Sequence, residues 1–159
     1  MAGSLDGEKI ALVVKTPGEW TQFAKLSNDW NAEPGAPMPE VCVHGPDLTL
    51  TFFLNPWRFS QFKENDRGEI TFRDCWRYRL SYPNDEGWYR HQCRFSRRAP
   101  DWGEFYEVSG NLLDGLPEDW IVLREPQSAS RHFLFYFKDD TFECDAADWS
   151  LRILPAKVS

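Results

Sequence analysis

Arginines recur through the middle of this chain at a spacing that could place several of them on one surface. If residues 69–82 and 90–97 form neighbouring antiparallel strands, Arg77 lies opposite Arg94 and the other arginines lie nearby. Guanidinium groups bind carboxylates and phosphates in bidentate fashion, so this arginine surface could dock an acidic protein partner or an anionic small ligand. The candidate binding residues are Arg73, Arg77, Arg79, Arg94 and Arg98.

The same arginines could instead be neutralised within the chain. Residues 58–98 contain ten Lys or Arg and six Asp or Glu, whereas residues 99–159 contain five and twelve. Acidic stretches at residues 118–119 or 139–140 could fold over the arginine surface, which would then be architecture rather than a docking site. Both interpretations stay open.

A second set of side chains could form a pocket. The same strand register lines up Asp74, Arg97 and Glu104 at one end of the apolar face, and His91 lies on that face as well. Paired carboxylates are what general acid–base chemistry needs, but such a row is also typical of a structural ion pair at the end of a sheet. His91 and Cys93 lie two residues apart on one strand, roughly 7 Å from each other, which is too far for a nucleophile and its base.

Other kinds of chemistry leave no pattern in the sequence. We find no glycine-rich phosphate loop, no Gly-x-Ser-x-Gly elbow and no paired cysteine spacing. The three histidines lie far apart and predict no metal-ligand cluster. The sequence therefore predicts no cofactor and no metal, and it favours a protein that is not an enzyme.

Strands must position the candidate residues, and the segment 69–109 carries the strongest strand pattern. Over residues 69–82 apolar side chains alternate with polar ones, which predicts one strand with one buried face. Residues 90–97 and 104–110 predict the next two strands of a meander. In the register that pairs Arg94 with Glu107, the rings of Trp76, Phe95 and Tyr106 lie side by side in neighbouring strands.

The rest of the chain predicts further strands and one helix. A capping pattern formed by Thr16, Pro17 and Glu19 predicts a helix that runs to about residue 29. Further strands are predicted at residues 9–15, 41–44, 48–54, 120–124, 131–138, 141–145 and 151–154, with hairpins about 45–47 and 139–140 and a helical turn at 145–149. We therefore predict a single domain, residues 1–159, of mainly β class. It is an antiparallel sandwich or partly open barrel with one short N-terminal helix, bordering on the α+β class.

Aromatic residues predict both the core and the loops that recognise a partner. Phe133, Phe135 and Phe137 should face the core across the second hairpin, while the other side of that strand, with Leu134 and Tyr136, is expected to be half exposed. Residues 55–62 (NPWRFSQF) and 84–88 (NDEGW) could carry recognition, because loops on rigid sheets commonly do. Tryptophans in turns usually cover the ends of a core, but exposed ones would be anchors at a protein interface. The turn tryptophans are Trp57, Trp88 and Trp102.

Composition narrows the class of protein. The net charge of −7 argues against general nucleic-acid binding, and no run of about 18 apolar residues could span a membrane. Four scattered cysteines are typical of reduced, packed thiols in a cytoplasmic protein. We therefore expect a soluble, cytoplasmic binding module that uses its arginine surface. Two alternatives stay open: a small-molecule pocket protein or enzyme with an aromatic β-barrel cavity, and an acidic inhibitor or immunity-type protein.

Overall fold

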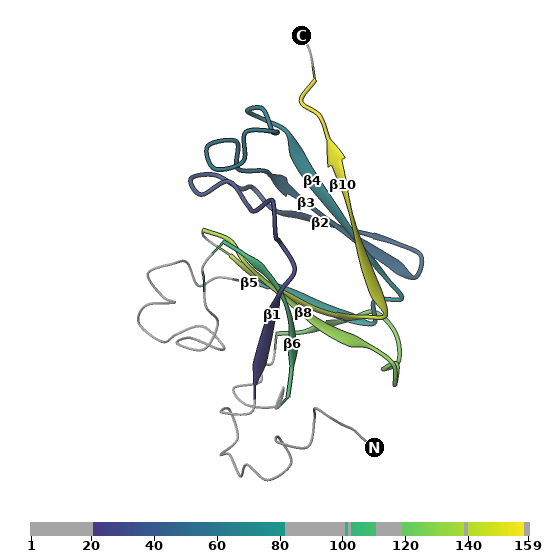
Figure 1. The fold of residues 1–159 in the computed structure, drawn as a ribbon. Coiled ribbons are helices and arrows are strands. Elements are labelled where there is room, and N and C mark those ends of the chain that lie inside the picture. The colour runs from purple at the N-terminus through teal and green to yellow at the C-terminus, as the bar shows by residue number, and fades with distance from the viewer. Residues whose placement is uncertain (1–20, 82–100, 102, 111–118, 139, 158–159) are drawn as a thin grey trace.

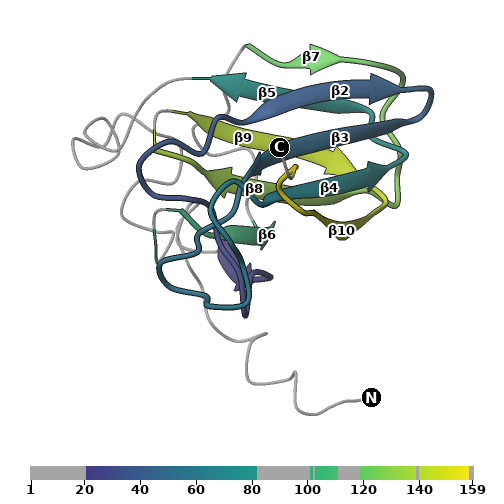
Figure 2. The same cartoon turned by 90° about the horizontal axis from the view of Figure 1, so that it is seen from above.

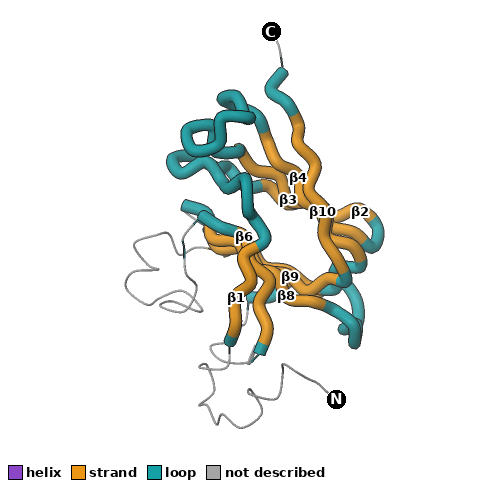
Figure 3. Tube along the Cα trace, in the orientation of Figure 1, coloured by secondary structure: helices purple, strands orange, loops and turns teal. Residues whose placement is uncertain are grey.

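Two antiparallel sheets pack face to face in this protein (Figures 1 and 2). The computed structural model describes residues 21–81, 101, 103–110, 119–138 and 140–157. Within these ranges the regular elements are all strands (Figure 3), and no helix there has the length and apolarity to cross a membrane. The prediction of an antiparallel sandwich is confirmed.

The strands of the six-stranded sheet follow the order β1-β6-β8-β9-β5-β7, and those of the four-stranded sheet follow β10-β4-β3-β2. Their bounds are β1 Gln22–Lys25, β2 Glu40–His44, β3 Asp47–Phe53, β4 Arg67–Arg73, β5 Arg77–Ser81, β6 Phe105–Ser109, β7 Ile121–Val122, β8 Arg131–Tyr136, β9 Thr141–Ala146 and β10 Asp148–Leu154.

Both predicted hairpins are present. In the first, His44 pairs with Asp47, so Gly45 and the following proline make the turn, and Gly45 takes a φ of +58° that favours glycine. In the second, Tyr136 of β8 pairs with Thr141 of β9. Short connections between alternating runs made both hairpins predictable from local sequence.

The predicted single strand over residues 69–82 is wrong, because the chain turns a corner in its middle. Asp74 takes a φ of +52°, which ends β4 and sends β5 into the other sheet. A second crossing lies beside the first, where β9 leads into β10 and Ala147 donates its N–H to the carbonyl oxygen of Arg73. The ribbon formed by β4 and β10 therefore continues around the corner as β5 and β9 (Figure 1). The helical turn predicted at 145–149 is replaced by this crossing.

The predicted meander is also wrong in its pairing. β6 lies between β1 and β8, where Tyr106 pairs with Lys25 and Leu134, and β5 lies between β9 and β7. Trp76 belongs to the corner and to no strand. Phe95 and the rest of the predicted strand 90–97 lie outside the described residues, as does the predicted strand 9–15.

The described part of the predicted helix forms a strand. β1 pairs with the edge of β6, so the polar backbone of residues 22–25 is satisfied between strands rather than within a helix. Trp30 enters the core from the loop that follows β1. Thr16, Pro17 and Glu19 lie outside the described residues.

Aromatic rings fill the space between the two sheets. The ring centroids of Phe135 and Phe137 lie 4.1 Å apart, and those of Phe52 and Phe135 lie 5.0 Å apart in an edge-to-face arrangement. The prediction that Phe133, Phe135 and Phe137 face the core is confirmed. Leu134 and Tyr136, expected to be half exposed, are fully buried as well. The apolar run of β8 is typical of a strand covered on both faces.

Candidate functional site

A chain of charged side chains crosses the face of the six-stranded sheet that points away from the aromatic core. His132 of β8 contacts Asp145 through Nδ1 at 2.8 Å and Glu143 through Nε2 at 2.7 Å. Arg77 donates from Nε to Asp145 at 2.6 Å, and Arg79 donates from Nη1 to Glu143 at 2.9 Å. The charges thus alternate in sign from one strand to the next.

The same network reaches the surface through Asp119. Arg79 donates to both oxygens of this carboxylate, at 2.8 and 3.2 Å. Asp119 is about half exposed, whereas Glu143 and His132 are buried. Three cations and three carboxylates balance one another, which is how buried charges are tolerated inside a protein. We call the set the buried charge network, and its members are Arg77, Arg79, Asp119, His132, Glu143 and Asp145.

Proton affinities in this network follow from its contacts. Burial opposes protonation of His132, but hydrogen bonds and charge from Asp145 and Glu143 outweigh that effect and raise the pKa of the imidazole. Burial raises the pKa of Asp145, but His132 and Arg77 prevail and leave it lowered. The hydrogen bond from Arg79 lowers the pKa of Asp119. All three groups are therefore held in their charged forms.

The buried charge network has the properties of a structural element. Both ring nitrogens of His132 are held by carboxylates, so the imidazole has no free lone pair with which to act as a general base. The guanidinium carbon of Arg77 lies 4.1 Å from the ring centroid of Trp120 and 4.5 Å from that of Trp76. No group of three potential metal ligands suited to a metal ion occurs among the residues that the structure describes.

These contacts show where the arginines of the predicted binding surface lie. Arg77 and Arg79 lie on the six-stranded sheet, while Arg73 lies on the four-stranded sheet and pairs with Asp148 at 2.5 Å. Arg94 and Arg98 lie outside the described residues. The three candidate arginines that the structure describes all pair with carboxylates of the same chain, which favours the internal-pairing interpretation. The sequence pattern pointed to Asp119 but missed Glu143, Asp145 and His132. Glu143 and Asp145 could have been found from their spacing. They lie two residues apart, as Arg77 and Arg79 do, so two paired strands can bring them together.

The two described members of the predicted alternative pocket make separate contacts. Asp74 lies at the corner, where its backbone N–H donates to a carboxylate oxygen of Asp47 at 3.2 Å. Glu104 is buried and shares none of these contacts. Arg97 and His91 lie outside the described residues.

Glu104 instead anchors the loops at one end of the sandwich. Its carboxylate accepts hydrogen bonds from Ser27 at 2.7 Å and from Asn31 at 2.9 Å. Lys25 and the exposed Arg58 approach it at 3.7 and 3.6 Å. A buried carboxylate with this many donors fixes the loop after β1 against the start of β6.

The anchor extends to the loop between β3 and β4. The carbonyl oxygen of Asn31 accepts the N–H of Asn55 at 3.1 Å. The side-chain oxygen of Asn55 accepts the N–H groups of Trp57 at 3.1 Å and Arg58 at 3.3 Å, which is an Asx-type turn. A path of hydrogen bonds therefore leads from Glu104 to the turn that carries Trp57.

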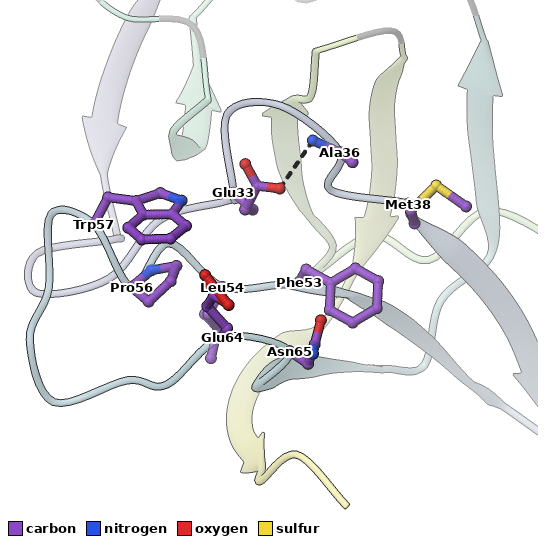
Figure 4. Close-up of a pocket in the computed structure, with 9 residues that line it drawn as sticks. All are labelled: Glu33, Ala36, Met38, Phe53, Leu54, Pro56, Trp57, Glu64 and Asn65. Carbon is purple, nitrogen blue, oxygen red and sulfur yellow. Dashed lines mark hydrogen bonds between the residues drawn. The ribbon is translucent and has the colours of Figure 1, made fainter.

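Beside this turn lies a pocket of about 270 Å³ (Figure 4). Trp57 and Met38 on its rim are 68% and 62% exposed. Met38 and Asn65 have φ angles of 50° and 73°, and residues held in such sparsely populated conformations cluster at functional sites. We call it the loop-end pocket. Its described lining residues are Glu33, Ala36, Met38, Phe53, Leu54, Pro56, Trp57, Glu64 and Asn65.

The sequence identified part of this pocket. Residues 55–62 were predicted to carry recognition, and Trp57 is an exposed turn tryptophan, as the interface alternative requires. Glu33, Met38 and Glu64 come from two loops whose proximity is set by tertiary structure. Comparison of the chain with protein-family models, with curated proteins and with solved structures finds no significant match.

Proposed function

We propose that this protein is a non-enzymatic β-sandwich module that binds a partner protein through the loop-end pocket. The observation that carries the proposal is the exposure of Trp57 beside that pocket. An indole left largely in water is unusual in a chain that buries most of its described rings between two sheets. Tryptophan is also among the residues that contribute most to the free energy of binding at interfaces.

Rigidity of the surrounding loops supports the same function. The hydrogen bonds through Glu104, Asn31 and Asn55 hold the turn of Trp57 in place before any partner arrives. A preorganised anchor loses less conformational entropy on binding than a mobile one. The pocket is therefore suited to recognition.

The other interpretations of the sequence receive less support from the geometry. Charges on Arg73, Arg77 and Arg79 are already offset by carboxylates of the same chain, which leaves less attraction for an acidic partner. A ligand cavity inside a barrel would need open space between the sheets, where Phe52 and Phe135 are in ring contact.

Capture of partners from the native source tests the proposal. We compare the wild-type protein with Trp57→Ala and with Val122→Ala, a control that alters an equally exposed apolar side chain on β7. Trp57→Ala should weaken capture by about tenfold or more, as expected for an interface anchor, without lowering the melting temperature. Equal capture by Trp57→Ala and wild type would refute a role for this pocket.

A further inference from the structure

The charge of the loop-end pocket indicates the chemistry of what it binds. Two carboxylates, Glu33 and Glu64, belong to its described lining, and none of those lining residues is a lysine, arginine or histidine. Glu33 accepts N–H groups from Gly35 at 2.6 Å and from Ala36 at 3.0 Å, which orients its carboxylate (Figure 4). A ligand that enters this pocket therefore meets negative charge.

Cations already lie over the neighbouring rings. The guanidinium carbon of Arg67 lies 5.8 Å from the ring centroid of Phe53, and that of Arg58 lies 5.3 Å from that of Phe59. Trp57 lies between these two rings in the sequence, yet no cation of the described residues lies over its indole. Tryptophan gives the strongest cation–π attraction of the three aromatic side chains, and the largely exposed indole of Trp57 can receive a cation of the ligand.

Size and shape restrict the ligand further. A volume of about 270 Å³ is below the range of roughly 300–1,000 Å³ that is typical of pockets for drug-sized molecules. A single extended side chain is small enough to enter a space of this volume. Glu33 and Glu64 come from separate loops, on different sides of the pocket in Figure 4. An ammonium group carries three rotatable donors on a long apolar stem, so two carboxylates can share it.

A neighbouring cavity is lined by a further hydrogen-bond acceptor. It has a volume of about 100 Å³, and Glu33 lines it as well as the loop-end pocket. Asn31 also lines it, and the buried side-chain oxygen of Asn31 has no hydrogen-bond partner among the described residues. Lys138 lines this second cavity too, so a cation of the chain already lies there, whereas the described lining of the loop-end pocket contains none.

We propose that the loop-end pocket binds a lysine side chain of the partner protein, with the ammonium group near Trp57, Glu33 and Glu64. This inference rests on the proposed function and adds the chemical class of the ligand. It also explains why carboxylates and an exposed indole occur together at this rim.

Titration with small probes tests the inference separately from partner capture. The probes are a short Gly-Ser peptide with one central lysine, the same peptide with norleucine in that position, and tetramethylammonium. Binding is followed through the indole N–H signal of Trp57, assigned with a Trp57→Phe variant. The lysine peptide should bind about fivefold tighter than the norleucine peptide and tighter than tetramethylammonium.

Matched variants locate the charge that is responsible. Glu64→Gln should weaken binding of the lysine peptide about threefold, whereas Glu125→Gln, the same change at another exposed acid, should leave it unchanged. Equal binding of the lysine and norleucine peptides would overturn the inference, and so would failure of every probe to bind. Tighter binding of tetramethylammonium would overturn it in favour of a free quaternary ammonium ligand. The proposed function would stand in any of these cases if capture still depended on Trp57.

Discussion

Replacing Arg79 with glutamine should destabilise the protein far more than a typical change of a charged residue. The guanidinium group contacts Glu143 at 2.9 Å and Asp119 at 2.8 Å, and the Arg79 side chain is only 10% exposed. Breaking a buried ion pair by removing one partner costs about 3–5 kcal/mol. Because His132 still contacts Glu143 in the variant, we expect the lower end, about 3 kcal/mol. In a domain of this length that loss lowers the melting temperature by about 6–12 °C.

Arg152→Gln provides the matched control. Arg152 also lies in a strand and pairs with a carboxylate, Glu69, at 2.7 Å, but its side chain is 70% exposed. Its replacement should change the free energy of unfolding by no more than about 0.5 kcal/mol. Thermal melts followed by circular dichroism, at low and at high salt, measure both variants against the wild type.

The comparison also decides between the two interpretations of the arginines. A melting temperature for Arg79→Gln as close to wild type as that of Arg152→Gln would refute the reasoning from burial and pairing. If that variant also lost capture of an acidic partner, Arg79 would be a docking residue after all. A large drop in melting temperature with normal capture supports a structural role for the buried charge network.

Three further predictions concern the pH response, the core and the loop anchor. Because the pKa of His132 is raised in the folded state, its stabilising contribution is complete below about pH 6.5 and is lost as the pH rises through the raised value. Urea unfolding should show this decline for wild type and not for His132→Gln, and a pH-independent wild type would contradict it. A Cβ at Gly68 would lie 2.8 Å from Cζ of the buried Phe52, so Gly68→Ala should cost about 1–3 kcal/mol in chemical denaturation. Thr71→Ala in the same strand serves as its control, and equal losses would refute the clash. Asn55→Ala should lower stability by about 1 kcal/mol and weaken partner capture, because the turn of Trp57 loses its acceptor; unchanged capture would show that the turn holds without it.

Local patterns predicted the hairpins but not the order of the strands. Even-numbered residues point into the core on both sides of the corner, as Phe72 does in β4 and Leu80 does in β5. The alternation has the same phase before and after the corner, although the chain changes sheets there, with Asp74 exposed and Cys75 buried. The positive φ of an aspartate is not visible in an apolar–polar pattern, and strand neighbours far apart in sequence are set by packing.

The prediction of an N-terminal helix was wrong for a related reason. Its capping pattern is a local signal, while pairing of β1 with the edge of β6 is a tertiary contact that local signals do not report. The sequence could place Trp57 in a turn, because that signal is local. It could not place Glu33 and Glu64 in one pocket, because they belong to two different loops. The network around His132 was missed because its acids belong to a strand that was not expected beside β5.

The corner at Asp74 joins the two sheets at one end of β4, and the loop-end pocket lies at the other end of that strand. Two crossings between the sheets, after β4 and after β9, lie at that corner. Among the described strands the chain also crosses between β1 and β2, and the loop that carries Trp57 precedes the other end of β4. The seven residues of β4 form a lever about 20 Å long. A change of about 5° in the angle between the sheets would move the far ends by about 2 Å. The described lining of the loop-end pocket lies between residues 33 and 65, in or beside strands of the four-stranded sheet, so such a movement would carry the pocket with that sheet.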